Sequence, residues 1–182
     1  MGPEIATNIG SMLRALENVV IPAIDPENGL AREQSWLIMM YLRLMAEQHD
    51  QIFHFRLREI REFHALASEL LRLQPAALPE DEITRSAYTA LEAAKPLLAL
   101  ELPHYEALAE TARTLRALAD ALTQRICDNG NAEQRSLIGA MLLDQAKIEA
   151  LRERSWVAGL GQDPKPEELP PRGQFIECQQ TP

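Results

Sequence analysis

Four histidines are the side chains in this sequence best suited to acid–base or metal chemistry: His49, His54, His64 and His104. A di-iron site in a helical bundle needs two Glu-x-x-His pairs, with further carboxylates from facing helices. Glu101 and His104 form the one such pair in the chain. His49 and His64 would lie about 22 Å apart along a helix, too far to share an ion. We therefore expect neither a metal nor another cofactor.

The surroundings of His64 allow two interpretations. It interrupts an apolar ladder between Ile60 and Ala67. A buried neutral imidazole with a hydrogen-bond partner is the commoner explanation for such a position. The alternative is a general base or polar anchor in an apolar pocket for acyl or aromatic compounds. The candidate ligand-binding residues on that interpretation are His64, His49, Tyr41 and Arg56, and none of them is assigned a catalytic role.

The arginines Arg56, Arg58 and Arg61 could bind an anionic ligand or an acidic partner. They alternate with Glu59 and Glu62, and Arg58 has Glu62 four residues later. Oppositely charged residues at that spacing pair on a helix surface, so a solvated helix face is the favoured interpretation.

The sequence contains no motif that assigns a catalytic nucleophile or a phosphate-binding site. Cys127 falls at a predicted helix C-terminus, where the helix dipole opposes a thiolate. Neither a Gly-x-Gly-x-x-Gly fingerprint nor a phosphate loop occurs. Whether the protein is an enzyme stays open at this point.

Composition predicts an all-α cytoplasmic protein. The chain of 182 residues is rich in Ala, Leu, Glu and Arg, which favour helices. The net charge is −9 and only three lysines occur, so we expect no nucleic-acid partner. The longest apolar run, Trp36–Leu42, is far below the roughly 20 residues of a membrane span. The first residues lack the basic and apolar parts of a signal peptide.

The elements that would position these residues are about five helices in an up-down bundle. Apolar periodicity and breakers place them at about 3–21, 30–73, 79–96, 104–126 and 132–157. Pro22 should end or kink the first helix. Asn131 and Gln134 have the spacing of a capping box. We predict a bundle domain over 1–157 and an extended Pro/Gly-rich tail over 158–182.

Apolar stripes indicate which face of each helix is inward. Residues 36–42 are apolar on several sides, as expected for a helix surrounded by others. One face of the first helix should hold Ile5, Ile9, Met12, Leu16 and Val19, and the apolar stripe of the last helix should hold Leu137, Met141, Ile148 and Leu151.

The segment from Leu30 to Leu73 contains neither Pro nor Gly. A continuous helix of that length would be about 66 Å long and would protrude from a compact domain. It either bends near the polar segment Glu47–Gln51 or extends and is covered by another subunit. The three-four ladder keeps its phase through that segment, so we predict one long central helix and a homodimer that covers it.

Four N-terminal segments carry a resemblance: Ser11–Glu17, Val20–Pro26, Leu30–Gln34 and Tyr41–Met45. Over about the first 45 residues the chain resembles uncharacterised all-helical bacterial proteins that accompany aminoglycoside-phosphotransferase-like kinases and acyl-CoA dehydrogenases. The resemblance implies an accessory role beside a metabolic enzyme and brings no catalytic residues. The first functional hypothesis is therefore a non-catalytic, self-associating accessory or interaction protein. The alternative is an apolar-ligand binder or small enzyme with a pocket near His64.

Overall fold

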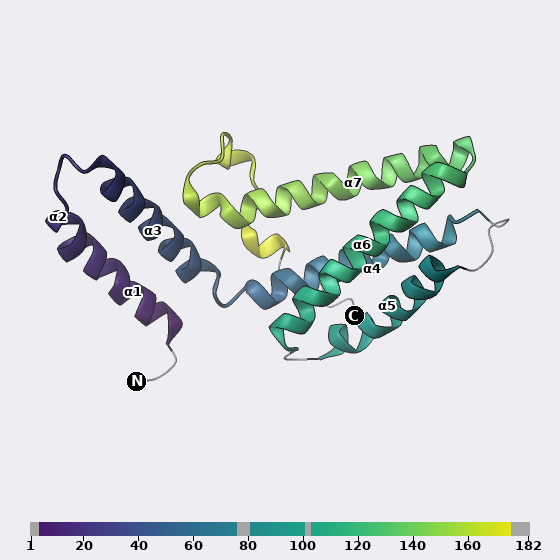
Figure 1. Cartoon of the computed structure of the whole chain (residues 1–182), viewed down its shortest axis with the longest axis horizontal. Coiled ribbons are helices and arrows are strands. Elements are labelled where there is room, and N and C mark those ends of the chain that lie inside the picture. The colour runs from purple at the N-terminus through teal and green to yellow at the C-terminus, as the bar shows by residue number, and fades with distance from the viewer. Residues whose placement is uncertain (1–3, 76–80, 101–102, 176–182) are drawn as a thin grey trace. The chain divides into compact units, whose positions relative to one another are not determined.

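The computed structural model describes residues 4–75, 81–100 and 103–175, and every regular element among them is helical (Figure 1). The all-α prediction is therefore confirmed. None of these helices combines the length and the apolarity needed to cross a bilayer. The described chain forms two compact units. One holds the residues up to Ile52 together with Leu151–Gln174, and the other holds the residues from Phe53 to Ala150. The predicted division into a bundle over 1–157 and a tail over 158–182 stays a prediction.

The first helical segment is continuous but changes its winding near a proline. It consists of α1 (Ile5–Ala15), the π-helical turn η1 (Leu16–Val20) and α2 (Ile21–Ala23). Pro22 has no N–H to donate, and its ring crowds the carbonyl four residues earlier. The wider π turn lies immediately before this proline, and the helix ends one residue after it. The predicted effect of Pro22 on the first helix is thus confirmed.

The prediction of one long central helix is wrong. α3 (Gly29–Gln48) and α4 (Ile52–Arg72) are separate helices joined by the turn His49–Gln51. In this turn the backbone N–H of Gln51 donates to the Gln48 carbonyl oxygen at 2.9 Å. The His49 ring nitrogen Nδ1 lies 2.9 Å from the Ala46 carbonyl oxygen. These local bonds compete with the helical pattern and end α3.

The apolar ladder could not reveal this break. Three turn residues are close to the 3.6 residues of one helical turn, so the three-four spacing passes through them unchanged. The break also coincides with the boundary between the two units, which falls after Ile52. Each helix therefore belongs to a different compact unit.

The second unit is built on a core shared by four helices: α4, α5 (Glu82–Ala99), α6 (Tyr105–Asn129) and the part of α7 (Ala132–Val157) up to residue 150. α5 and α6 pack side by side (Figure 1). The largest fully buried apolar side chains are Ile60, Leu70, Leu108, Leu115, Leu122, Ile126 and Ile138.

The stripe predicted for the last helix is exposed at three of its four residues, Leu137, Ile148 and Leu151, whereas Met141 packs against the core. Leu137 is 47% exposed, whereas its neighbour Ile138 is 2% exposed. Ile138 joins the core together with Met141 and Leu142. Further along the same inward face comes Glu149, which accepts a hydrogen bond from Arg116 of α6. Because polar groups with partners occupy part of the inward face, the most apolar stripe of this helix is not the buried one.

The predicted capping box at the start of α7 is confirmed. The Asn131 side-chain oxygen accepts from the Gln134 N–H at 2.8 Å, and the Gln134 side-chain oxygen accepts from the Asn131 N–H at 2.9 Å. Gln134 also donates to the Leu73 carbonyl oxygen, which ties this cap to the end of α4. Asn28 caps α3 in the same manner by accepting from the Ala31 N–H at 3.1 Å.

Replacing Asn131 by alanine is expected to lower the free energy of unfolding by about 1 kcal/mol, the usual cost of losing an N-cap. Asn131→Asp keeps the acceptor oxygen and adds a negative charge at the positive helix end, so it should retain the stability. Urea denaturation of both variants measures the difference. Equal stability of the two variants would show that the cap contributes nothing.

Residues 158–175 form three short 3-10 turns, η2 (Ala158–Leu160), η3 (Pro166–Glu168) and η4 (Arg172–Phe175). Two ion pairs anchor this segment within the first unit. Arg172 binds the Glu47 carboxylate at 2.9 Å, and Arg154 binds Asp163 through two parallel bonds of 2.9 Å. The remaining residues of the predicted tail, 176–182, lie outside the described part of the chain.

The Asp163 anchor is expected to weaken in acid. Its bonds from the Arg154 guanidinium and the Lys165 N–H lower the pKa of Asp163 from 3.8 to about 2. A carboxylate whose pKa is lowered in the folded state stabilises that state above its unfolded pKa. This stabilisation is lost as the pH falls from 3.8 through about 2. The difference in unfolding free energy between the wild type and Asp163→Asn should therefore be constant near neutral pH and shrink over that acid range. Urea titrations at several pH values test it, and a difference independent of pH would contradict the expectation.

Candidate functional site

The four predicted ligand-binding residues do not line one site. Tyr41 and His49 belong to the first unit, whereas Arg56 and His64 belong to the second. Tyr41 is 57% exposed on α3, and His49 lies in the turn that follows it. His64 lines a pocket between α4 and α5 whose lining includes none of the other three.

Arg56 takes part in a charge network rather than lying open to a ligand. It donates to Glu59 at 2.6 Å, and buried Glu59 also accepts from Arg116 at 3.1 Å. Burial by itself would lower the pKa of Arg56, but hydrogen bonds to Tyr105 and Glu59 outweigh it and raise the pKa. The predicted Arg58–Glu62 pair is confirmed at 2.7 Å, so this arginine-rich face is internally paired.

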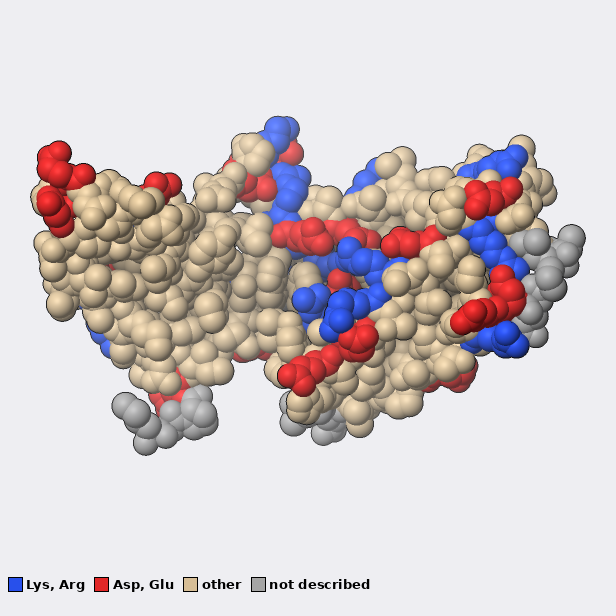
Figure 2. Space-filling view, in the orientation of Figure 1, with Lys and Arg blue, Asp and Glu red and all other residues tan. Residues whose placement is uncertain are grey.

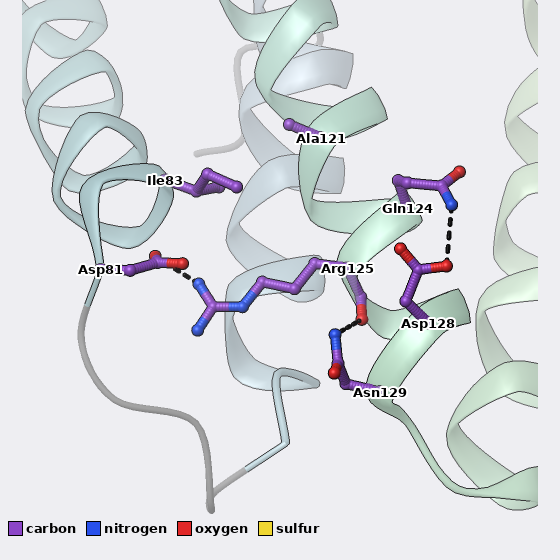
Figure 3. Close-up of a pocket in the computed structure, with 7 residues that line it drawn as sticks. All are labelled: Asp81, Ile83, Ala121, Gln124, Arg125, Asp128 and Asn129. Carbon is purple, nitrogen blue, oxygen red and sulfur yellow. Dashed lines mark hydrogen bonds and ion pairs between the residues drawn. The ribbon is translucent and has the colours of Figure 1, made fainter.

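A pocket of about 490 Å³ lies where the start of α5 meets the end of α6 (Figure 3). Arg125 reaches across it from α6, binds the Asp81 carboxylate and donates to the Thr84 hydroxyl oxygen at 2.9 Å. Asp81 is also the N-cap of α5, and the bond from the Thr84 N–H, together with Arg125, lowers the pKa of Asp81.

The lining of this pocket does not suit catalysis. It contains Asp81, Arg125 and Asp128 but no His, Cys, Ser, Thr or Lys side chain. The Gln124 amide donates to Asp128 at 2.9 Å, so the lining groups mainly bind one another (Figure 3). Nucleophilic or acid–base catalysis needs a nucleophile beside a base, and that pair is missing from this lining. The Arg125–Asp81 ion pair therefore links the end of α6 to the start of α5.

Among residues 4–75, 81–100 and 103–175, no group of three or more His, Cys, Asp and Glu side chains comes together in a way that would hold an ion.

The most unusual surface of the described chain lies on the first unit, where α1 and α3 pack as an antiparallel pair (Figure 1). Ile9 of α1 and Met39 of α3 are buried. An ion pair between Arg43 and Glu17 joins the helices along one side of this contact. The side of the helix pair that faces away from this ion pair is therefore formed by α1 and α3 together.

Helical spacing places exposed apolar residues on that opposite side. Residues five apart on a helix are separated by about 140° around its axis. Ile38 is five residues before Arg43, and Met12 is five residues before Glu17, so both project away from the ion pair. Their neighbours one or two turns along complete two stripes: Ile5 and Met12 on α1 with Val19 in the adjoining turn η1, and Ile38, Tyr41 and Met45 on α3.

The two stripes, with Val20 and Leu30 at their edges, form what we call the α1–α3 face. Its eight large apolar side chains are each between 45% and 68% exposed. The polar positions within the stripes are uncharged: Asn8 and Gln34. Figure 2 shows a broad area over these two helices with few charged side chains.

Helical periodicity in the sequence did not distinguish this exposed face from the core. It places Ile5, Met12 and Val19 on one helix face with Ile9, and of these four residues only Ile9 is buried. Residues 36–42 were expected to be surrounded by other helices, yet Trp36, Ile38 and Tyr41 are at least half exposed. The signal in the sequence that could have revealed this face is that residues 36–42 are apolar on more sides of their helix than the other helices of one chain cover.

Comparisons of the chain with protein-family models, with curated proteins and with solved structures find no match.

Proposed function

We propose that the protein is a non-catalytic helical protein that self-associates by packing its α1–α3 face against the same face of a second copy. The observation that carries this proposal is the pair of uncharged apolar stripes on that face. Such a face can be shared by two identical partners across a two-fold axis. Two helix pairs meeting in this way would form an intermolecular four-helix bundle.

The area of the face fits a dimer. Aromatic side chains bury about 150–250 Å² when fully covered, so half-exposed Tyr41 leaves on the order of 100 Å² open. Eight comparable side chains leave roughly 800 Å², which is what each partner contributes to a standard interface. The largest apolar patch on a typical monomer is about 300–600 Å². The α1–α3 face therefore exceeds what a monomer usually leaves open.

Charge supports a second copy and determines how salt should act. Each chain carries a net charge of −9, so two copies repel each other over most of their surface. Contact between the uncharged stripes of two identical chains does not bring their carboxylates close to one another. Added salt screens the repulsion between the remaining charges, so association through this face should tighten as the salt concentration rises.

Size-exclusion chromatography with light scattering tests the proposal on the intact chain. We expect twice the chain mass at micromolar concentration and a larger dimer fraction in high salt. A monomer mass under both conditions would overturn the proposal. A dimer that dissociates in high salt would instead indicate an interface held by ion pairs.

The predicted homodimer thus rests on α3, the first half of the segment that was expected to be one long helix. A cytoplasmic location, a bacterial origin and an accessory role beside a metabolic enzyme remain proposals that rest on the sequence.

A further inference from the structure

Two methionines bring an oxidisable group to the α1–α3 face. Met12 on α1 is 54% exposed, and Met45 on α3 is 55% exposed. The two other methionines of α3, Met39 and Met40, are each only 9% exposed. A dissolved oxidant reaches a thioether sulfur only where the side chain is accessible. The single chain therefore offers the oxidant two sulfur atoms on this face and shields two others of the same helix pair.

Both exposed methionines belong to the stripes that form the proposed interface. Met12 lies between Ile5 and Val19 in the first stripe, and Met45 follows Tyr41 by one turn in the second. Oxidation converts the flexible apolar thioether into a polar sulfoxide, which disrupts contacts between apolar surfaces. A two-fold dimer contains each residue twice, so two oxidised residues per chain place four sulfoxides in one interface.

We propose that Met12 and Met45 are oxidative modification sites and that their conversion to methionine sulfoxide dissociates the dimer. The switch rests on the proposed function, because dissociation presupposes a dimer. The oxidant is a peroxide. The thioether sulfur attacks one peroxide oxygen, a sulfur–oxygen bond forms, the oxygen–oxygen bond breaks, and the departing oxygen takes up the proton to leave as water. The sulfur loses two electrons and the peroxide gains them.

Association and oxidation oppose each other at this face. The dimer covers both sulfur atoms, so oxidation proceeds through the free chain. A sulfoxide oxygen has to lose its bound water in order to enter an interface whose large side chains are apolar, and this desolvation favours the free chain. Oxidised chains therefore accumulate as monomers. Methionine sulfoxide reductases reverse the modification with electrons from thiols, so reduction returns the chain to the dimer.

Treatment of the intact protein with hydrogen peroxide tests the proposal, after both cysteines have been alkylated so that disulfides cannot form. Peptide mass spectrometry locates the sulfoxides, and sedimentation equilibrium gives the dissociation constant of the dimer. We expect Met12 and Met45 to gain oxygen well before Met39 and Met40. The dissociation constant should rise about tenfold or more. Methionine sulfoxide reductase should restore its original value.

The double variant Met12→Leu, Met45→Leu is the matched control. Leucine is apolar and close to methionine in volume, so the untreated variant should associate as tightly as the wild type. It has no sulfur at either position, so peroxide should leave its dissociation constant unchanged. If the untreated variant does not dimerise, the reductase step decides: a wild-type dimer that reduction does not restore would overturn the proposed switch.

Two further kinds of result separate the switch from the dimer itself. A wild-type dimer that keeps its dissociation constant with Met12 and Met45 oxidised would overturn the switch and leave the dimer intact. An equal rise in the double variant would do the same, as would oxidation of Met39 and Met40 at the rate of the exposed pair. An untreated protein that is a monomer at every concentration would overturn the dimer, and the switch with it.

Discussion

Tyr41→Asp is expected to convert the protein from a dimer into a monomer at micromolar concentration. Tyr41 lies near the middle of the α3 stripe and is 57% exposed in the single chain, so the variant should fold normally. In the dimer the new carboxylate would be buried without a partner, which costs several kcal/mol. Since each 1.4 kcal/mol changes an equilibrium constant tenfold, the dissociation constant should rise by more than about 100-fold. Sedimentation equilibrium measures this directly.

Trp36→Asp provides the matched control for Tyr41→Asp. Trp36 is an aromatic residue of the same helix and is 50% exposed. It lies seven residues before Arg43, which places it on the side of the Arg43–Glu17 ion pair and away from the α1–α3 face. This variant should keep the wild-type dissociation constant. Equal weakening by both substitutions, or none by either, would place the interface elsewhere.

Ile138→Ala is expected to lower the free energy of unfolding by about 2–5 kcal/mol, whereas Leu137→Ala should change it by less than about 0.5 kcal/mol. Ile138 is 2% exposed and packs in the core of the four-helix unit, so its truncation leaves a cavity. Leu137, its neighbour, is 47% exposed. Urea denaturation of the two variants under identical conditions gives both values.

The reverse order of stability would mean that α7 is turned by about 100°, one residue around the helix, so that the apolar stripe predicted from the sequence faces inward. Equal losses would mean that neither position dominates the packing of this helix. Either result would contradict the assignment of Ile138 to the core.

Local signals predicted most of the helices. The Asn131–Gln134 capping box and the effect of Pro22 each depend on residues within one turn of one another. Such interactions follow from chain geometry and require no knowledge of the neighbouring helices. For that reason the starts of α3 and α7 and the end of α2 agree closely with the sequence prediction.

The errors have a common origin in contacts made by residues distant in sequence. The break at His49–Gln51 preserves the apolar phase, so periodicity alone cannot detect it. The inward face of α7 includes Glu149, whose partner Arg116 lies on another helix. A purely apolar criterion cannot anticipate a polar residue that finds its partner across the core.

The candidate sites show the same limit. The sequence singled out His64, and the structure places it at a pocket with a buried, unpartnered ring nitrogen. Tyr41 was also singled out, but as a ligand-binding residue, and it lies on the exposed α1–α3 face. The other helices decide which apolar stripe of a helix they cover and which they leave exposed. That choice depends on how the helices pack and cannot be read from the sequence of one helix.

Thiol protection at the α1–α3 face tests the central claim most directly. In a Met45→Cys variant one thiol lies on the α3 stripe, while Cys127 is exposed on α6 and serves as an internal reference. The alkylation rates of both thiols are followed by mass spectrometry as the protein concentration is raised. If the face binds a second copy, the rate at position 45 falls with concentration while the rate at Cys127 stays constant. A ratio of the two rates that is the same at every concentration would contradict the proposed interface.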